Sequence, residues 1–308
     1  MTGNTGTGGT VCNGAGNVGP FIPDHFDTVV TGPMSCPSGL SCPLGGLVYS
    51  GQAFTANVYA RNAAGATTQN YDGTGNTSPN FAKAVTLTAW DALGSEVTEN
   101  PPAGPGDAIS GSSVASSAFN RGSTVSPGNP GAPVYTFGTS PTAPTDVYIR
   151  AKDTDNVTSL RVPANTSVEG GVKVVSGRIR LANAYGSELL ALPITATAQY
   201  FNAAGSWVTS ITDSVTQFNT RLSTAGGNVQ ATIVNGPLAV GDISVVAAGT
   251  VTLANGVRIF RLAAPNVAGS ADLEIITAPA YLLPGAVGRA TFGVYKGSNE
   301  IIYMREAY

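Results

Sequence analysis

The chain has 308 residues, of which 42% are hydrophobic and only 11% are charged, and its formal net charge is −3. So low a charged fraction excludes charge-rich disorder and disfavours amphipathic helices, whereas 39 Gly and 20 Pro favour short strands joined by turns. The 15 Lys and Arg residues are scattered, so we expect no nucleic-acid partner, and no apolar run reaches the roughly 20 residues of a membrane-spanning helix.

The first 19 residues are rich in Gly, Thr and Asn, and we expect residues 1–19 to form a flexible arm. They lack the basic and apolar regions of a signal peptide, so an exported protein would have its signal outside this chain. Cys36 and Cys42 bracket the turn-rich segment PSGLS, which favours a small disulfide loop. Cys12 would then be free, cross-linked to sequence outside the chain, or the true partner of one of the other two.

His25 is the only histidine, and the cysteine spacing matches no common zinc pattern. Asp24 and Asp27 flank it, but no serine lies in a strained strand-to-helix elbow that would supply a nucleophile. We therefore interpret His25 as a structural side chain near a domain edge.

Period-2 patterns between turn signals predict strands and hairpins along most of the chain. The main ones lie at residues 54–68, 83–98, 145–156, 172–183 and 193–209. No stretch sustains a helical pattern for three turns. Residues 100–133 are rich in Pro, Gly and Ser and alternate little, which predicts a long loop that is disordered, packed and inert, or in contact with a ligand.

A weak internal repeat relates the two halves of the chain. TANVYARNAAG at 55–65 aligns with TATAQYFNAAG at 195–205, and both end in the same Asn-Ala-Ala-Gly turn. Gly in the last position suits a turn that needs positive φ. The repeat predicts an all-β protein of two tandem immunoglobulin-like antiparallel β-sandwich domains, at 20–168 and 169–308, with the boundary in the turn-rich segment 162–171.

Three residues in KDTDN offer oxygen ligands at nearby positions: Asp153, Asp155 and Asn156. A calcium site is one interpretation, but the Gly and distal Glu of an EF-hand loop are missing, and a polar β-turn explains the same residues. Trp90 and Trp207 are the only tryptophans and lie beside predicted hairpin turns, where each is either a platform for a glycan or part of the core. No pair of carboxylates has the spacing of an acid–base pair, so we predict no catalytic residues and no cofactor, calcium aside.

The segment RIRLAN has a strict alternation. Ile179 and Leu181 share one face of the predicted strand, while Arg178 and Arg180 share the other. The following SELLALP is predicted to cross the end of the domain, with Leu189, Leu190 and Leu192 plugging it.

The phrases NAYGSELLALP and RATFGVYKG, together with GPFIPDHF and YSGQAFTANVYARNAAG, resemble the C-terminal region of MshQ-like proteins. These are encoded with the mannose-sensitive haemagglutinin (MSHA) type IV pilus of Gram-negative bacteria. The resemblance covers nearly the whole chain from about residue 19. It implies an exported protein associated with pilus biogenesis or adhesion, and it supplies no catalytic residues.

We therefore expect a non-enzymatic, extracellular or cell-surface module linked to a type IV pilus, with pilus or surface proteins as partners and no membrane insertion. Two alternatives remain open. One is a carbohydrate-binding module that recognises host or surface glycans through an exposed aromatic side chain. The other is a self-assembling subunit, in which an end strand pairs with a neighbouring molecule.

Overall fold

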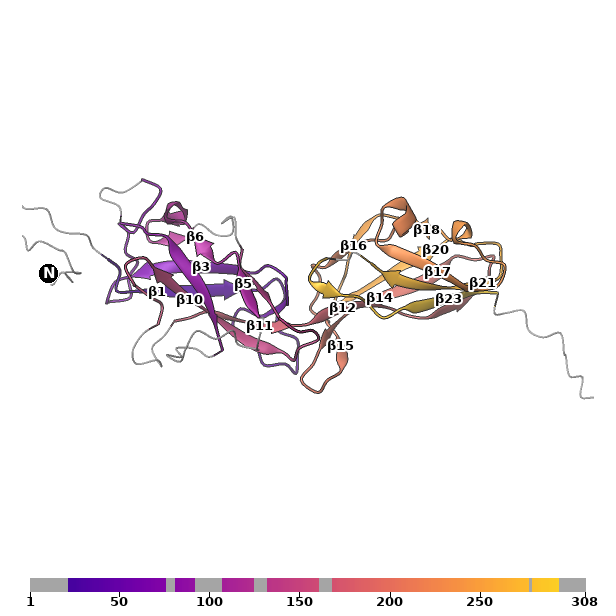
Figure 1. The fold of residues 1–308 in the computed structure, drawn as a ribbon, viewed down its shortest axis with the longest axis horizontal. Coiled ribbons are helices and arrows are strands. Elements are labelled where there is room, and N and C mark those ends of the chain that lie inside the picture. The colour runs from indigo at the N-terminus through magenta and orange to yellow at the C-terminus, as the bar shows by residue number, and fades with distance from the viewer. Residues whose placement is uncertain are drawn as a thin grey trace, which may run out of the picture. The chain divides into compact units, whose positions relative to one another are not determined.

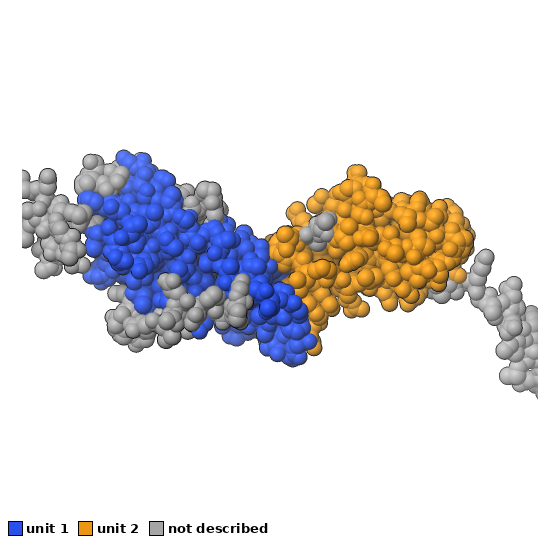
Figure 2. All heavy atoms as spheres, viewed as in Figure 1, with its two compact units in different colours: residues 1–176, 201–205 blue, residues 177–200, 206–308 orange. Residues whose placement is uncertain are grey.

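The structure is a computed structural model that describes residues 22–75, 81–91, 107–124, 132–160, 168–276 and 279–293. The described residues form strands joined by turns and a few three-residue 3-10 helices, so the predicted all-β class is confirmed. The chain divides into two compact units, residues 1–176 with 201–205, and residues 177–200 with 206–308 (Figure 2). The expected arm 1–19, with Cys12, lies outside the described residues.

The first unit extends further than the expected boundary after residue 168. Strand β11 (Gly171–Val175) pairs with β10 (Thr145–Asp153) on one side and with β2 (Leu47–Tyr49) on the other. It is therefore the last strand of the first unit, which ends at Ser176. The turn-forming residues that suggested a boundary at 162–171 precede this strand instead of following it.

Two sheets make up most of the first unit (Figure 1). One has the order β1-β3-β8-β7, from β1 (His25–Thr31), β3 (Thr55–Arg61), β8 (Ser123–Thr124) and β7 (Phe119–Asn120). The other has the order β2-β11-β10-β4-β6 and adds β4 (Val85–Trp90) and β6 (Ser113–Val114). A small separate sheet joins β5 (Ala108–Ser110) to β9 (Val134–Thr136).

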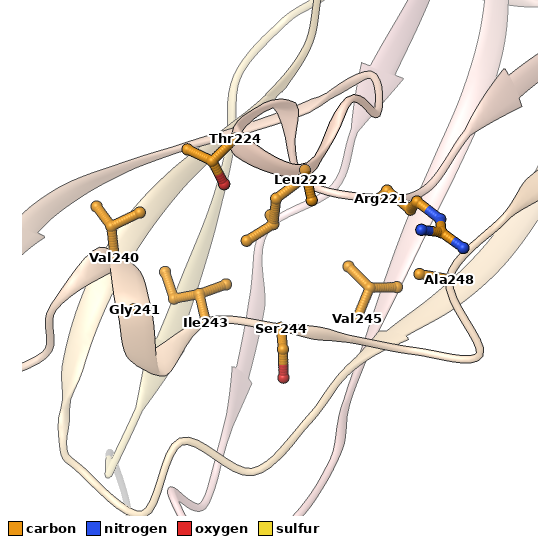
Figure 3. A pocket seen from close by; sticks show the side chains of 10 residues that line it. Arg221, Leu222, Thr224, Val240, Gly241, Ile243, Ser244, Val245 and Ala248 are labelled. Carbon is orange, nitrogen blue, oxygen red and sulfur yellow. The ribbon is translucent and has the colours of Figure 1, made fainter.

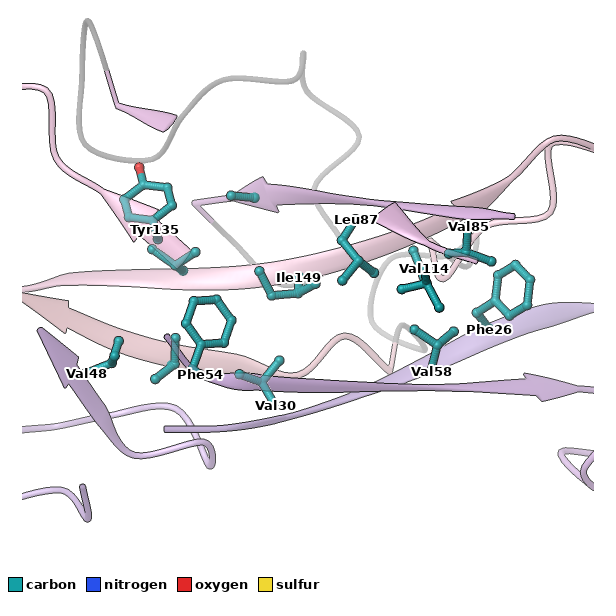
Figure 4. Close-up of a cluster of buried hydrophobic side chains, with 14 of the residues drawn as sticks. Phe26, Val30, Val48, Phe54, Val58, Val85, Leu87, Val114, Tyr135 and Ile149 are labelled. Carbon is teal, nitrogen blue, oxygen red and sulfur yellow. The ribbon is translucent and has the colours of Figure 1, made fainter. Parts of the chain in front are cut away.

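The inner faces of these two sheets share one hydrophobic core. Val30 and Val58 come from the first sheet, Leu87 and Ile149 from the second, and their side chains point toward one another (Figure 4). All four are buried because each lies on the inward parity of its strand. This packing accounts for the alternation in the sequence of β3, β4 and β10, which lie within the predicted segments 54–68, 83–98 and 145–156.

The segment 100–133 differs from the long loop that we expected. Its described part contains the short strands β5 to β8 and the 3-10 helix η1 (Ser116–Ala118). Val114 and Phe119 from this segment are buried in the core of the unit. Strands of two or three residues are too short to show a period-2 alternation, so this Ser- and Gly-rich sequence gave no sign of them.

The second unit also has two main sheets. The larger has the order β18-β20-β14-β12-β22, with β15 on β14; its strands are β18 (Val245–Val246), β20 (Val257–Leu262), β14 (Leu192–Phe201), β12 (Gly177–Leu181), β22 (Leu282–Leu283) and β15 (Trp207–Thr209). The smaller has the order β13-β23-β21-β17, from β13 (Ala184–Gly186), β23 (Gly288–Phe292), β21 (Gly269–Ile275) and β17 (Val229–Asn235). The remaining elements are β16 (Gln217–Asn219), which pairs with β19 (Thr250–Thr252), and the 3-10 helices η3 (Ser223–Ala225) and η4 (Val240–Asp242).

The sequence led us to expect antiparallel strand pairing throughout, but three of the described pairs are parallel. The pairs β2–β11, β12–β22 and β13–β23 are parallel. In each pair one member is the terminal strand of its sheet and has only two or three residues. A short strand of this kind covers the edge of a longer one, which protects the exposed edge from pairing with another chain.

The internal repeat corresponds to equivalent strands in the two units. TANVYAR is β3 and the matching TATAQYF ends β14, and each leads into its Asn-Ala-Ala-Gly turn. Gly65 and Gly205 close these turns with backbone φ angles of 79° and 77°, a region that residues with a Cβ atom rarely adopt. The two turn sequences are therefore alike for a stereochemical reason.

The Leu-rich turn after β13 behaves differently from the predicted plug. Leu189 and Leu190 are 64% and 69% exposed, and only Leu192, which begins β14 on its inward parity, is buried. A backbone hydrogen bond from Leu190 to Ser187 forms a turn here, which leaves the two leucines outside the core.

Candidate functional site

Cys36 and Cys42 form a disulfide in the first unit, with their Cα atoms 5.9 Å apart. The loop between them contains a turn in which the Leu40 amide donates to the carbonyl of Pro37, and Gly39 has a φ of 87°. The disulfide thus closes a short turn, which is what the spacing of the two cysteines suggested. It has a structural role.

The calcium candidates lie in a β-turn that uses its own carboxylate. Asp153 is buried; its Oδ1 accepts hydrogen bonds from the amides of Asp155 and Val157, and its Oδ2 accepts one from the Tyr71 hydroxyl. Asn156 has a φ of 65°, which Asn tolerates in turns. The oxygens of Asp153 therefore cap the turn, as the polar-turn interpretation of KDTDN predicts.

Burial is the main cause that raises the pKa of Asp153, and the hydrogen bond from Tyr71 opposes it. Burial also raises the pKa of Tyr71 well above its ordinary value, with the charge of Asp153 as the second cause. Within the described ranges, no three His, Cys, Asp or Glu side chains gather as a metal site requires.

Trp90 is 6% exposed, so it is not an open platform for a sugar. Its indole lies under the guanidinium of Arg150, with 3.7 Å from Cζ to the ring centroid. Arg150 forms a buried ion pair with Glu169 at 2.6 Å, and Ser159 donates a second hydrogen bond to the same carboxylate oxygen. The sequence analysis missed this cluster because Glu169 lies in the segment that we took for a domain boundary.

His25 lies between two carboxylates at the start of β1. Its Nδ1 is 2.9 Å from Asp24 Oδ2, and its Nε2 is 3.4 Å from Asp27 Oδ1. Arg61, directly opposite His25 in the β1–β3 register, donates to Asp27 at 2.7 Å. No described serine or cysteine hydrogen-bonds to the imidazole, and the arrangement ties two strands together, as a structural histidine does.

Trp207 is half-buried at the outer face of the larger sheet of the second unit. The Arg178 guanidinium lies over its ring, with 4.3 Å from Cζ to the centroid, and Arg178 Nε donates to Gln199 Oε1 at 3.0 Å. These three side chains come from β15, β12 and β14, so they form a row across three adjacent strands. The guanidinium of Arg178 covers one face of the Trp207 ring, and this contact holds the arginine side chain in place.

Arg180 continues the basic character of this outer face. The predicted alternation of RIRLAN is confirmed, since Ile179 and Leu181 are buried whereas Arg180 is exposed. Arg178 and Arg180 lie on the same side of β12, two residues apart. Burial lowers the pKa of Arg178, and the like charge of Arg180 lowers it further.

An apolar pocket of about 570 Å³ lies elsewhere in the second unit, between the η3 turn and the segment from η4 to β18. Leu222 points across it toward Ile243, with Val240 and Val245 beside it and Arg221 at one end (Figure 3). Its lining contains no carboxylate and no histidine. The pocket therefore holds no acid–base pair.

Two family models together match almost the whole chain. The model for the third domain of DUF6701 matches residues 3–176, and the model for the fourth domain matches residues 175–307. No curated protein matches the chain. Among solved structures, the Yersinia pseudotuberculosis adhesin InvE is 14% identical with a TM-score of 0.31; the match covers 87% of this chain and 59% of that one.

Proposed function

Because the chain belongs to the DUF6701 family and carries its third and fourth domains, we propose that it is a non-enzymatic structural module of an exported surface protein. The family boundary near residue 175 coincides with the end of the first compact unit. Each family domain thus corresponds to one compact unit, except that the turn at 201–205 groups with the first unit.

We further infer that each unit is an immunoglobulin-like sandwich, and strand order is the observation that carries the proposal. In the first unit, β1-β3-β8-β7 corresponds to the A-B-E-D sheet of that fold, and β11-β10-β4 corresponds to G-F-C. In the second unit, β12-β14-β20-β18 corresponds to the A-B-E-D sheet, and β23-β21-β17 corresponds to G-F-C. In both units a short strand lies parallel to the last one, β2 or β13.

Tandem sandwiches of this plan suit a spacer or stalk in a surface protein. Several buried polar groups that would otherwise suggest a reactive site serve the fold: Asp153 caps a turn, and Glu169 pairs with Arg150. The Cys36–Cys42 disulfide favours an oxidising compartment, because such bonds are rare in the cytosol. No helix in the described part of the chain has the length and hydrophobicity of a membrane span.

The link to a type IV pilus of the MSHA kind is the finer part of the proposal and depends on the resemblance of NAYGSELLALP and RATFGVYKG to MshQ-like proteins. Self-association is the alternative for which β17 is the candidate, since it is a seven-residue edge strand. Its irregular register between Ile233 and Asn235 argues against open-ended pairing, because bulges disrupt edges.

The test uses a bacterium that carries the parent gene. Protease added to intact cells should cleave the module, and the module should co-purify with pili sheared from the surface, while a cytoplasmic marker stays intact. Recovery of the module in the cytoplasmic fraction with reduced Cys36 and Cys42 would contradict the proposal. Sheared pili that lack the module would remove the pilus link alone.

A further inference from the structure

The outer face of the larger sheet in the second unit carries three arginines. Arg178 and Arg180 lie on β12, and Arg261 lies on β20, two strands away. In the register, Arg178 lies opposite Gln199, Arg180 opposite Thr197, and Arg261 opposite Pro193, so all three share the face opposite to the buried side chains of β14. None forms an ion pair with a described carboxylate.

Uncharged side chains fill the space between these arginines. Thr195, Thr197 and Gln199 lie on the same face of β14, and the hydroxyl or amide of each can both donate and accept hydrogen bonds. Ile259, opposite Thr195, is 57% exposed. With strands about 4.8 Å apart and residues about 3.4 Å apart, the backbone positions of Arg178 and Arg261 are about 23 Å from each other.

Arg178 is already oriented for an anionic partner. The Trp207 ring supports its guanidinium from one side and Gln199 accepts from Nε, which leaves the terminal nitrogens without a described acceptor. A fixed guanidinium loses little entropy when it binds, and its planar donors match the two oxygens of a carboxylate. Arg180 places a second positive charge close by, and this repulsion would be relieved by a bound anion.

From this geometry we propose that the face formed by Arg178, Arg180, Arg261, Gln199 and Trp207 binds an acidic polysaccharide whose sugars carry carboxylates. Widely spaced arginines separated by hydroxyl and amide groups match a polymer in which charges alternate with neutral hydroxyls. Nucleic acid carries a far denser charge, about one per 1.7 Å of duplex, and requires more cations than this face presents. This binding role goes beyond the structural one and does not depend on a pilus.

The experiment is isothermal titration of the whole chain with polygalacturonate oligosaccharides at low and at physiological salt. A neutral oligosaccharide of equal length is the control for the sugar. A DNA duplex and vesicles containing phosphatidylserine are controls for other anions. Saturable binding of the uronate that weakens with salt, with no binding of the neutral sugar, is expected.

The variants separate this face from general charge. Arg180→Ala and Arg261→Ala should each weaken uronate binding about tenfold, because each removes a charge-assisted hydrogen bond. Arg258→Ala is the matched control: Arg258 is also exposed on β20 but lies opposite Ala196, on the other parity. It should leave the affinity within about twofold.

Three outcomes would overturn the proposal: no uronate binding by the folded chain, equal losses in Arg258→Ala and Arg180→Ala, or tighter binding of DNA or vesicles than of the uronate. Circular dichroism checks that each variant is folded, and the exposure of Arg180 makes a folding defect in that variant unexpected. A surface location for the protein, tested separately above, is unaffected by any of them.

Discussion

Removing the carboxylate of Glu169 tests the buried cluster of the first unit. Glu169 Oε1 accepts from Arg150 Nε at 2.6 Å and from Ser159 Oγ at 3.0 Å, and Oε2 accepts from Arg150 Nη2 at 3.2 Å. The side chains of Arg150 and Glu169 are 7% and 0% exposed. Glu169→Ala would therefore leave a buried guanidinium against Trp90 without its carboxylate.

The expected cost is about 3–5 kcal/mol of unfolding free energy, the range measured when one partner of a buried pair is removed. At a urea dependence of about 2 kcal/mol per molar, the denaturation midpoint should fall by about 1.5–2.5 M. The double variant Arg150→Met, Glu169→Leu should lose far less, because it removes both charges and keeps apolar volume.

The assay exploits the two tryptophans, since the first unit contains Trp90 and the second contains Trp207. In a Trp207→Phe background, fluorescence reports unfolding of the first unit alone. A shift of the Trp90 transition also tests the domain boundary, because Glu169 would belong to the second unit under the division at residue 168. A midpoint change below about 0.5 M, or an equal loss in the double variant, would refute the reasoning.

Three further predictions concern the disulfide, the core and an exposed ion pair. Replacing both Cys36 and Cys42 with Ser should cost about 2 kcal/mol, the chain-entropy value for so short a loop, and unchanged thermal stability would show that the loop contributes nothing. Phe119→Ala should lower the unfolding free energy measured in urea by about 3–5 kcal/mol, since its ring is fully buried. A near-neutral effect would instead favour the interpretation of residues 100–133 as an inert loop. Hydrogen bonds from Arg289 lower the pKa of Asp272, so their stabilisation is present above the carboxylate's unfolded-state pKa and is lost as pH falls through the lower folded-state pKa. Asp272→Asn should therefore flatten the acid side of the melting-temperature profile, and an unchanged profile would argue against the pair.

Some features followed from local pattern alone. The alternation in RIRLAN placed Ile179 and Leu181 in the core and Arg178 and Arg180 outside it, because side chains on a strand alternate whatever the strand pairs with. The repeated Asn-Ala-Ala-Gly turns identified β3 and β14 as equivalent strands. Cysteine spacing suggested the Cys36–Cys42 loop for a similarly local reason.

The candidate sites depended on distant residues. Trp90 was one of two platform candidates, but its ring is covered by Arg150, which lies 60 positions further along the chain. Glu169, just before β11, completes the cluster by pairing with Arg150. The strands β7 and β8, with two residues each, gave no period to detect. Asp153 had the oxygen of a calcium ligand, and only the turn amides and Tyr71 show how that oxygen is used.

By itself, then, the sequence determined the strand character, the turn chemistry and which side chains of a strand face inward, because these depend on neighbours one to four residues apart. Tertiary structure alone decided that β11 closes the first unit and that Arg261 shares a face with Arg178 and Arg180. The physical reason is that strand pairing joins residues as distant in sequence as Leu47 and Lys173, which are 126 positions apart. The backbone hydrogen bonds that join such strands do not depend on the identity of the side chains, so the local sequence does not reveal them.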